Sequence, residues 1–340
     1  MGPSAISFKM NRLLRPIVLI PFLVGLALVF ALLTVADLRK VIHLMSGFRH
    51  LYLLFYLLLM IAYEVVRGVQ WHFLLDALAF RVPWRSQIFA FSLGEIGQNL
   101  PGGNYLQNYV LLEEEGADFG RTAAATLLIV LVAVGISLIG VVLLGVGSWS
   151  IWLRPLIVIG VPVSALIAWA GHRYFHLVAP SWVTEHTLMR AALRELRQLR
   201  AGVADLLHPR ILVLQVPLGG AYLLLAGTAL YVSARGIGQD SVSYPSALGI
   251  WFFTYATAQI LPLPIDIGVV EVTGVGALMA SGIEKNAAIS IMLVNRALSL
   301  GASLTIALIV TLLLRQEFRA MVRRQSSANA DENHASEPND

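Results

Sequence analysis

Charged side chains inside apolar stretches are the residues of this sequence best suited to chemistry. Glu64 and Arg67 lie three positions apart, so a helix places them on one face. Arg296 lies about eleven residues into a later apolar stretch, a depth of ~16 Å along a helix. A central arginine costs about 2.5–3.5 kcal/mol on insertion scales and needs a partner, and Asp266 and Glu271 are the candidates. A structural ion pair and anion binding are both compatible with this pattern.

Two apolar stretches are interrupted by groups that lipid cannot satisfy. Irregular backbone at membrane depth is stable only where it is buried in protein or lines a wet cavity. Pro101 removes an amide donor, and Gly102 and Gly103 favour unwinding, which frees backbone groups for other partners. The breaks therefore predict one of two structures. Either each break is a kink whose polar groups form hydrogen bonds with one another, or the breaks line a substrate cavity. The candidate residues are Asn99, Pro101, Gly102, Gly103, Asn104 and Gln107 in the first break and Pro262, Pro264, Asp266, Gly268 and Glu271 in the second.

The composition is that of an integral membrane protein. Of the 340 residues, 57% are hydrophobic and 13% are charged, whereas soluble domains carry about 25% charged residues. The absence of cysteine excludes disulfides and thiolate metal sites, and the histidines show no metal-ligand spacing. No motif for nucleic acid occurs, and the net charge of +4 suits contact with anionic headgroups. We expect the protein to use no cofactor and no metal. We expect its partners to be membrane lipids of an anionic or polyprenyl-phosphate type.

The apolar stretches predict an all-α polytopic membrane protein with a single transmembrane domain over residues 1–325. A span needs about 20 apolar residues. Six full spans are expected at about 14–36, 50–75, 121–148, 154–172, 210–234 and 286–314. The broken stretches at about 85–112 and 245–281 are either re-entrant helical hairpins or two further spans, which would make eight. Residues 187–207 form an amphipathic segment that lies in the headgroup layer or packs on its own protein, and the acidic tail 326–340 is expected to be disordered.

Basic residues predict which side of the membrane each end occupies. The N-terminal segment, residues 172–210 and the segment after the last span are rich in arginine. Because such segments stay in the cytoplasm, we expect both termini inside and the chain in the cell (cytoplasmic or inner) membrane. The apolar run that begins at Pro16 is long enough to span, so we expect a retained first helix rather than a cleaved signal peptide.

The two broken stretches are similar to each other in sequence. "PWRSQIFAFSLGEIGQNLP" ends at Pro101, and "YPSALGIWFFTYATAQILP" ends at Pro262. Both continue with glycine and an acidic residue and then with a long apolar segment rich in alanine. Halves of about 50–150 and 210–314, with breaks at matching places, predict a duplicated unit. If the chain enters the two units from opposite sides of the membrane, the units form an inverted repeat. Such a repeat is typical of secondary transporters.

The sequence resembles the lysylphosphatidylglycerol synthase/flippase transmembrane family. The second half carries the resemblance in "LPLPIDIGVVEVTGVGALMASGI" and "MLVNRALSL", where Pro264, Ile267, Gly268, Glu271 and Arg296 match the family pattern. The first half is similar through Trp71-His-Phe-Leu-Leu and Asn99-Leu-Pro-Gly. Because no aminoacyl-transfer domain follows the last span, the resemblance implies the translocation half of the family's activity.

Three functions are compatible with these observations. A lipid flippase would move a lipid with a polar, phosphate-containing headgroup between leaflets. An intramembrane enzyme would use Glu271 as acid or base with Arg296 on phosphate, but no known catalytic motif occurs and we expect no enzyme. A scaffold would present the arginine-rich segment. For a flippase, Glu64, Asp266 and Glu271 allow proton coupling, and passive scrambling is equally compatible.

Overall fold

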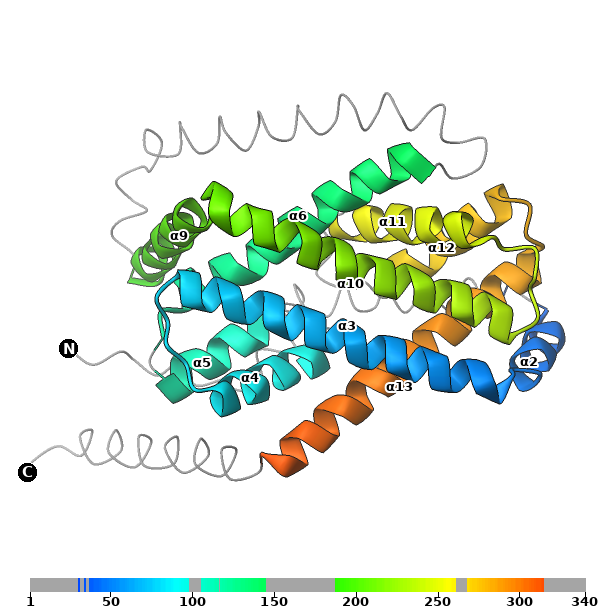
Figure 1. Ribbon diagram of the computed structural model, residues 1–340, viewed down its shortest axis with the longest axis horizontal. Coiled ribbons are helices and arrows are strands. Elements are labelled where there is room, and N and C mark those ends of the chain that lie inside the picture. The colour runs from blue at the N-terminus through cyan, green and yellow to red at the C-terminus, as the bar shows by residue number, and fades with distance from the viewer. Residues whose placement is uncertain are drawn as a thin grey trace, which may run out of the picture.

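The described part of the chain is entirely helical. A computed structural model describes residues 30, 34, 37–97, 105–115, 117–144, 187–260 and 268–314. Within these residues there are ten helices and no strand (Figure 1). The helices are α2 (Leu38–Ser46), α3 (His50–Ala77), α4 (Trp84–Gly97), α5 (Leu106–Glu115), α6 (Phe119–Leu144), α9 (Thr187–Leu206), α10 (Pro209–Gly236), α11 (Tyr244–Ile260), α12 (Val269–Ala280) and α13 (Lys285–Leu313).

Four of the described helices are long and apolar enough to cross a membrane, namely α3, α6, α10 and α13. α3 has 28 residues and is about 42 Å long, more than the ~30 Å of a bilayer core. Large apolar side chains such as Leu54 on α3 and Leu312 on α13 point outward, as lipid contact requires. These four candidate spans correspond to the spans predicted at about 50–75, 121–148, 210–234 and 286–314, of which residues 145–148 lie outside the described residues. The span predicted at 154–172, nearly all of that at 14–36, and the tail 326–340 lie outside the described residues.

Each predicted broken stretch contains two short helices. α4 and α5 have 14 and 10 residues, so they are about 21 and 15 Å long, and neither alone crosses the bilayer core. α11 and α12 have 17 and 12 residues and are likewise too short. The break points themselves, residues 98–104 and 261–267, lie outside the described residues. The described chain therefore has the order long, short, short, long twice, as α3 to α6 and as α10 to α13.

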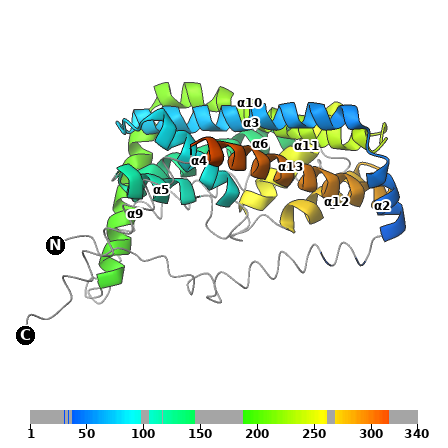
Figure 2. The same cartoon turned by 90° about the horizontal axis from the view of Figure 1, so that it is seen from below.

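Helices α3 to α6 form one set of four, and helices α10 to α13 form a second set of four; the two sets pack into each other. α3 and α10 lie side by side and run in opposite directions (Figure 1). α4 packs on α13, and α11 packs on α6, so the first short helix of each set contacts the last long helix of the other set. Figure 2 shows α3 and α10 in one layer with α4, α5 and α13 on one side of it. This exchange of contacts brings side chains from both sets to the centre of the bundle.

Trp71, from the motif that resembles the family, belongs to the apolar core. It is fully buried with Leu74, Phe89 and Leu128, and its ring centroid lies 6.1 Å from that of Phe91. The core therefore holds α3, α4 and α6 together next to the charged residues of α3.

α9 packs against the first turns of α6. The Gly120 amide donates to the Glu195 carboxylate at 3.1 Å, and Arg121 pairs with Asp205 at 3.0 Å. A Cβ on Gly202 would lie 2.8 Å from the Ala124 Cβ, so only glycine permits this approach. The amphipathic segment predicted at 187–207 is therefore a helix that packs on its own protein.

α2 was not predicted. Its N-cap residue Asp37 accepts hydrogen bonds from the Arg39 and Lys40 amides, and the Asp37 amide donates to the Asn286 side chain of α13 at 3.0 Å. Glu284 caps α13 by accepting from the Ala287 amide at 3.1 Å. Backbone hydrogen bonds, the strongest of them from Asn286, lower the pKa of the Glu284 carboxyl below its usual range. The hydrogen bond from Asp37 to Asn286 therefore links the first turn of α2 to the first turn of α13.

We expect Gly140→Val to destabilise the contact of α6 with α11. A Cβ on Gly140 would lie 2.1 Å from the Phe252 ring, so a larger residue must force the two helices apart. Overpacking of this kind costs about 1–3 kcal/mol. Thermal unfolding should show the loss, and an added Phe252→Ala should recover part of it by making room. Gly135→Ala is the matched control on the same helix, since no atom lies within 4 Å of its Cβ position; an equal loss there would contradict the explanation.

Candidate functional site

A polar cavity lies at the centre of the described helices. It has a volume of about 150 Å³ and is lined by residues of α3, α4, α5, α6, α10, α11, α12 and α13. Its charged and amide lining residues include Arg67, Glu95, Gln107, Asn295 and Arg296. Both sets of four helices therefore contribute an arginine to one cavity.

Arg67 is paired with a carboxylate from the neighbouring short helix. Its Nη1 lies 2.6 Å from Glu95 Oε1, and only 5% of the Glu95 side chain is exposed. The Arg67 guanidinium carbon also lies 5.4 Å from the ring centroid of Tyr63 and 5.9 Å from that of Phe91. Arg67 is therefore held between α3 and α4, with its charge facing the cavity.

Glu64 has a different partner from the one that its spacing suggests. Its Oε1 accepts a hydrogen bond of 2.8 Å from the Ser303 hydroxyl of α13. Glu64 also lines a second cavity of about 250 Å³ between α3, α4 and α13, whose walls are mostly apolar. The closest ion pair of Arg67 is thus made across helices with Glu95, because packing of α4 on α3 brings that carboxylate nearer.

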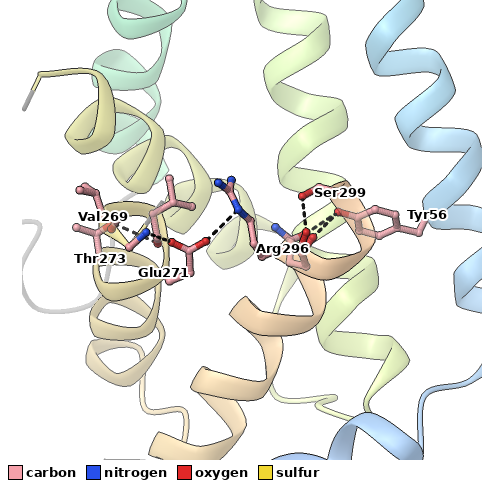
Figure 3. A network of polar contacts seen from close by, with 9 residues as sticks. Tyr56, Val269, Glu271, Thr273, Arg296 and Ser299 are labelled. Carbon is pink, nitrogen blue, oxygen red and sulfur yellow. Dashed lines mark hydrogen bonds and ion pairs between the residues drawn. The ribbon is translucent and has the colours of Figure 1, made fainter. Parts of the chain in front are cut away.

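Arg296 is paired with Glu271, as the sequence predicted. Its Nε lies 3.2 Å from Glu271 Oε1, and the Glu271 side chain is 2% exposed against 22% for Arg296. The two side chains point toward each other from α12 and α13 (Figure 3). Asp266, the other predicted partner, lies outside the described residues.

Glu271 is fixed by the start of its own helix. Its Oε2 accepts a hydrogen bond of 2.6 Å from the Gly268 amide, which forms one arm of a capping box. Gly268 has φ +86°, a conformation that glycine adopts without steric cost. The carboxylate also lies in the first turn of α12, where the helix dipole favours negative charge. The predicted residues Gly268 and Glu271 therefore act together to position Arg296.

Asn295 fixes the helix turn that carries Arg296. The Tyr56 hydroxyl lies 2.9 Å from the Asn295 carbonyl and 3.2 Å from its Oδ1, and Ser233 also donates to Oδ1 at 3.2 Å. Tyr56 lies on α3 and points toward α13 in Figure 3. Ser233 lies on α10, so α13 is held by both long helices.

Gln107 joins the first pair of short helices to α6. Its Nε2 and the Nδ2 of Asn108 both donate to the Thr126 hydroxyl at 3.0 Å. A Cβ on Gly94 would lie 2.7 Å from Gln107 Oε1, so glycine allows α4 and α5 to approach closely. Gln107 is the one residue of the first predicted break that the structure describes, and it lines the cavity.

The structure thus brings most of the described candidates to one place. Arg67, Gln107 and Arg296 line the polar cavity, Glu64 lines the adjoining one, and Gly268 and Glu271 support Arg296. The remaining candidates lie outside the described residues; they are Asn99, Pro101, Gly102, Gly103, Asn104, Pro262, Pro264 and Asp266.

Several cavity residues were not predicted. Glu95 is the most important, and its signal was an acidic residue inside an otherwise apolar helix. The hydroxyls of Tyr222 and Tyr255 lie 3.2 Å apart and give the cavity two more polar groups. Nothing in their spacing sets these tyrosines apart from ordinary core aromatics.

The arrangement suits an anion with several oxygen atoms. Guanidinium groups bind phosphate through paired hydrogen bonds, and both cavity arginines are already placed against carboxylates that an incoming anion would replace. Among the described residues no group of three or more His, Cys, Asp or Glu could hold a metal ion.

Comparison with known families gives a match that covers most of this chain. The family described as lysylphosphatidylglycerol synthase TM region matches residues 18–325, which is most of the chain. A comparison with curated proteins found no match.

Proposed function

We propose that this chain, which belongs to the lysylphosphatidylglycerol synthase transmembrane-region family, is a flippase-like transporter of phosphate-containing lipids. Family membership and the long apolar helices make it a multi-pass membrane protein with a function related to membrane lipids. Transport between the leaflets, rather than chemical modification of the lipid, is our proposal.

The observation that carries the proposal is the pair of arginines in one cavity. Arg67 and Arg296 come from different sets of four helices, and each is neutralised by a buried glutamate. A buried arginine without a counter-ion is costly, so each guanidinium must always have an anionic partner. A lipid phosphate can take the place of Glu95 or Glu271, and it can be released when the glutamate returns.

The arrangement of the short helices supports an inverted repeat. In Figure 1, α4 and α5 lie beside one end of α3, whereas α11 and α12 lie toward the other end. With cytoplasmic termini, α4 and α5 would enter from the cytoplasm and α11 and α12 from outside. The polar cavity lies between the two pairs. A headgroup could then approach it from either leaflet through one of two similar half-sites.

The intramembrane-enzyme alternative gains no support from Glu271. One of its carboxylate oxygens lies 3.2 Å from Arg296 Nε, and the other accepts a hydrogen bond from the Gly268 amide. Both oxygens are thus used to hold Arg296 and the start of α12 in place.

Transport in proteoliposomes tests the proposal. We expect the purified protein to move fluorescent phosphatidylglycerol between leaflets, measured as label that an impermeant reductant can bleach. Arg67→Gln and Arg296→Gln should each slow movement about 10- to 100-fold, because each removes a charge-assisted hydrogen bond worth about 1.5–3 kcal/mol.

Arg235→Gln is the matched control for this experiment. Arg235 pairs with Asp240 at the end of α10 and does not line the cavity. The Arg235→Gln variant should move phosphatidylglycerol at the same rate as the unchanged protein. If the unchanged protein moves lipid no faster than protein-free liposomes do, the flippase proposal fails.

A further inference from the structure

The apolar cavity beside the polar one lies between α3, α4 and α13. It has a volume of about 250 Å³, and its apolar lining residues include Gly68, Val69, Ile88, Ile306 and Val310. An apolar cavity of about 150 Å³ is already large enough to bind a small hydrocarbon such as benzene. The cavity therefore has room for part of a hydrocarbon chain.

Polar side chains of this lining form hydrogen bonds within the protein. Gln87 Oε1 lies 2.8 Å from Nδ1 of the His72 ring, and the Ser92 hydroxyl donates to a backbone carbonyl of its own helix at 2.8 Å. The Ser303 hydroxyl donates to the Glu64 carboxyl, also at 2.8 Å. The walls that remain for a ligand are mostly apolar.

The apolar cavity opens on the outer surface of the helices. Val65, Trp84 and Ile88 belong to its lining, and they are 58%, 53% and 43% exposed. They lie on α3 and α4, and other large apolar side chains on the surface of α3, such as Leu54, are exposed as well. A lipid chain can therefore enter between α3 and α4 from the bilayer.

The inner end of the apolar cavity adjoins the polar cavity. Phe91, Glu95 and Ser303 belong to both linings. The Arg67 guanidinium carbon lies 5.9 Å from the Phe91 ring centroid, and a Cβ on Gly68 would lie 3.7 Å from atoms of the same ring. The Phe91 ring is therefore next to both an arginine of the polar cavity and a wall of the apolar one.

The length of the apolar cavity is that of a lipid chain in one leaflet. Its lining on α4 extends from Trp84 to Glu95, a distance of about 16 Å along the helix axis. The hydrocarbon core of a bilayer is about 30 Å thick, so the chains of one leaflet reach about 15 Å. An α-helix is about 10 Å across and is too wide for a cavity of this length and volume. The dimensions therefore favour one chain over a peptide helix.

We propose that the apolar cavity holds one hydrocarbon chain of the lipid whose phosphate binds Arg67. This inference rests on the proposed transport of phosphate-containing lipids. Because phosphate and chains belong to one molecule, a headgroup at Arg67 must have its chains close by. The chain exchanges lipid for a wall of similar polarity, so the cavity adds little hydrophobic free energy. Instead, it gives the chain a place away from the polar groups around Arg67.

Photolabelling of the full chain in proteoliposomes tests the inference. The probe is phosphatidylglycerol with a diazirine in one acyl chain, and mass spectrometry locates the cross-links. We expect cross-links at Phe91 and Ala307, which line the apolar cavity and are buried from the surrounding bilayer. Cross-links at the exposed Leu54 measure ordinary contact with the bilayer.

Gly68→Leu is expected to fill the cavity. The Gly68 Cβ position has ordinary contact with Phe91, and leucine forms helices better than glycine does, so the variant should fold. Because the leucine and the lipid chain compete for the same space, cross-links at Phe91 and Ala307 should fall about tenfold relative to those at Leu54.

Gly220→Leu is the matched control on α10. Gly220 lines neither cavity, and no atom lies within 4 Å of its Cβ position. The cross-links of this variant should equal those of the unchanged protein. Diacylglycerol with the same diazirine chain but no phosphate should label Phe91 and Ala307 less; equal labelling would overturn the link to Arg67.

The outcomes separate this inference from the proposed function. If phosphatidylglycerol moves between leaflets but Phe91 and Ala307 are not labelled, the chain site is wrong and the transport function stands. If both are labelled and Gly68→Leu changes nothing, the chain does not occupy this cavity. If the labelling falls as expected but the protein moves no lipid, the flippase proposal fails and the lipid site stands. Should Gly68→Leu not fold, as size-exclusion chromatography would show, Gly68→Ala replaces it and should give a smaller loss.

Discussion

Arg296→Ala is expected to lower the thermal stability of the protein, and an added Glu271→Gln is expected to recover part of the loss. Removing one partner of a fully buried ion pair costs about 3–5 kcal/mol, because the other charge remains buried without its counter-ion. The loss should lie toward the lower value, since the Arg296 side chain is 22% exposed and Glu271 keeps the Gly268 amide. Glutamine retains an acceptor for that amide while it removes the charge. Unfolding of the detergent-purified protein, followed by tryptophan fluorescence, measures the change.

The double variant separates pairing from packing. If Arg296 acts mainly through its apolar stem, the losses of the two single variants should add, because no charge coupling exists to be relieved. If the pair is coupled, the double variant should be more stable than Arg296→Ala alone. Arg235→Ala is the control, because its pair with Asp240 lies at the end of α10 where water screens it. We expect no measurable loss there.

The Arg296–Glu271 pair was predictable because its determinants are local and strongly constrained. Glu271 follows Gly268 by three positions, which is the spacing of a capping box, so the start of α12 fixes the carboxylate. Arg296 sits inside a long apolar segment, where a charge needs a partner. The long helices α3, α6, α10 and α13 were predictable for a related reason, since the thickness of the bilayer sets their minimum length.

The Arg67–Glu95 pair was not predictable, because it depends on how two helices pack. Glu64 and Arg67 share a helix face, which is true of the structure, but a shared face does not decide which carboxylate lies nearest. The packing of α4 on α3 brings Glu95 to 2.6 Å from Arg67, and this packing cannot be read from the spacing of residues along one helix. α2 was missed because a helix of nine residues that includes Arg39 and Lys40 is too short and too charged to resemble a membrane span.

The two pairs of short helices are expected to fold back to the side from which they enter. The chain has no cysteine, so single cysteines can be introduced without a background. Ser243→Cys and Ser281→Cys should react with a membrane-impermeant thiol reagent in intact cells. Ser86→Cys and Glu113→Cys should react only after the membrane is opened. Labelling of the opened membranes controls for sites that the reagent cannot reach.

Helix length alone does not decide between folding back and crossing. α4 and α5 are each too short to cross, but end to end they would reach about 36 Å, which exceeds the ~30 Å bilayer core. The contact between α4 and α5 favours folding back, because helices that continue along one line would meet only at their ends. The short connections from α3 to α4 and from α5 to α6 then start and finish on one side of the membrane. If Ser86→Cys and Glu113→Cys, or Ser243→Cys and Ser281→Cys, react from opposite sides, that helix pair crosses the bilayer. The inverted repeat would then lose its basis, although the cavity and its two arginines would remain.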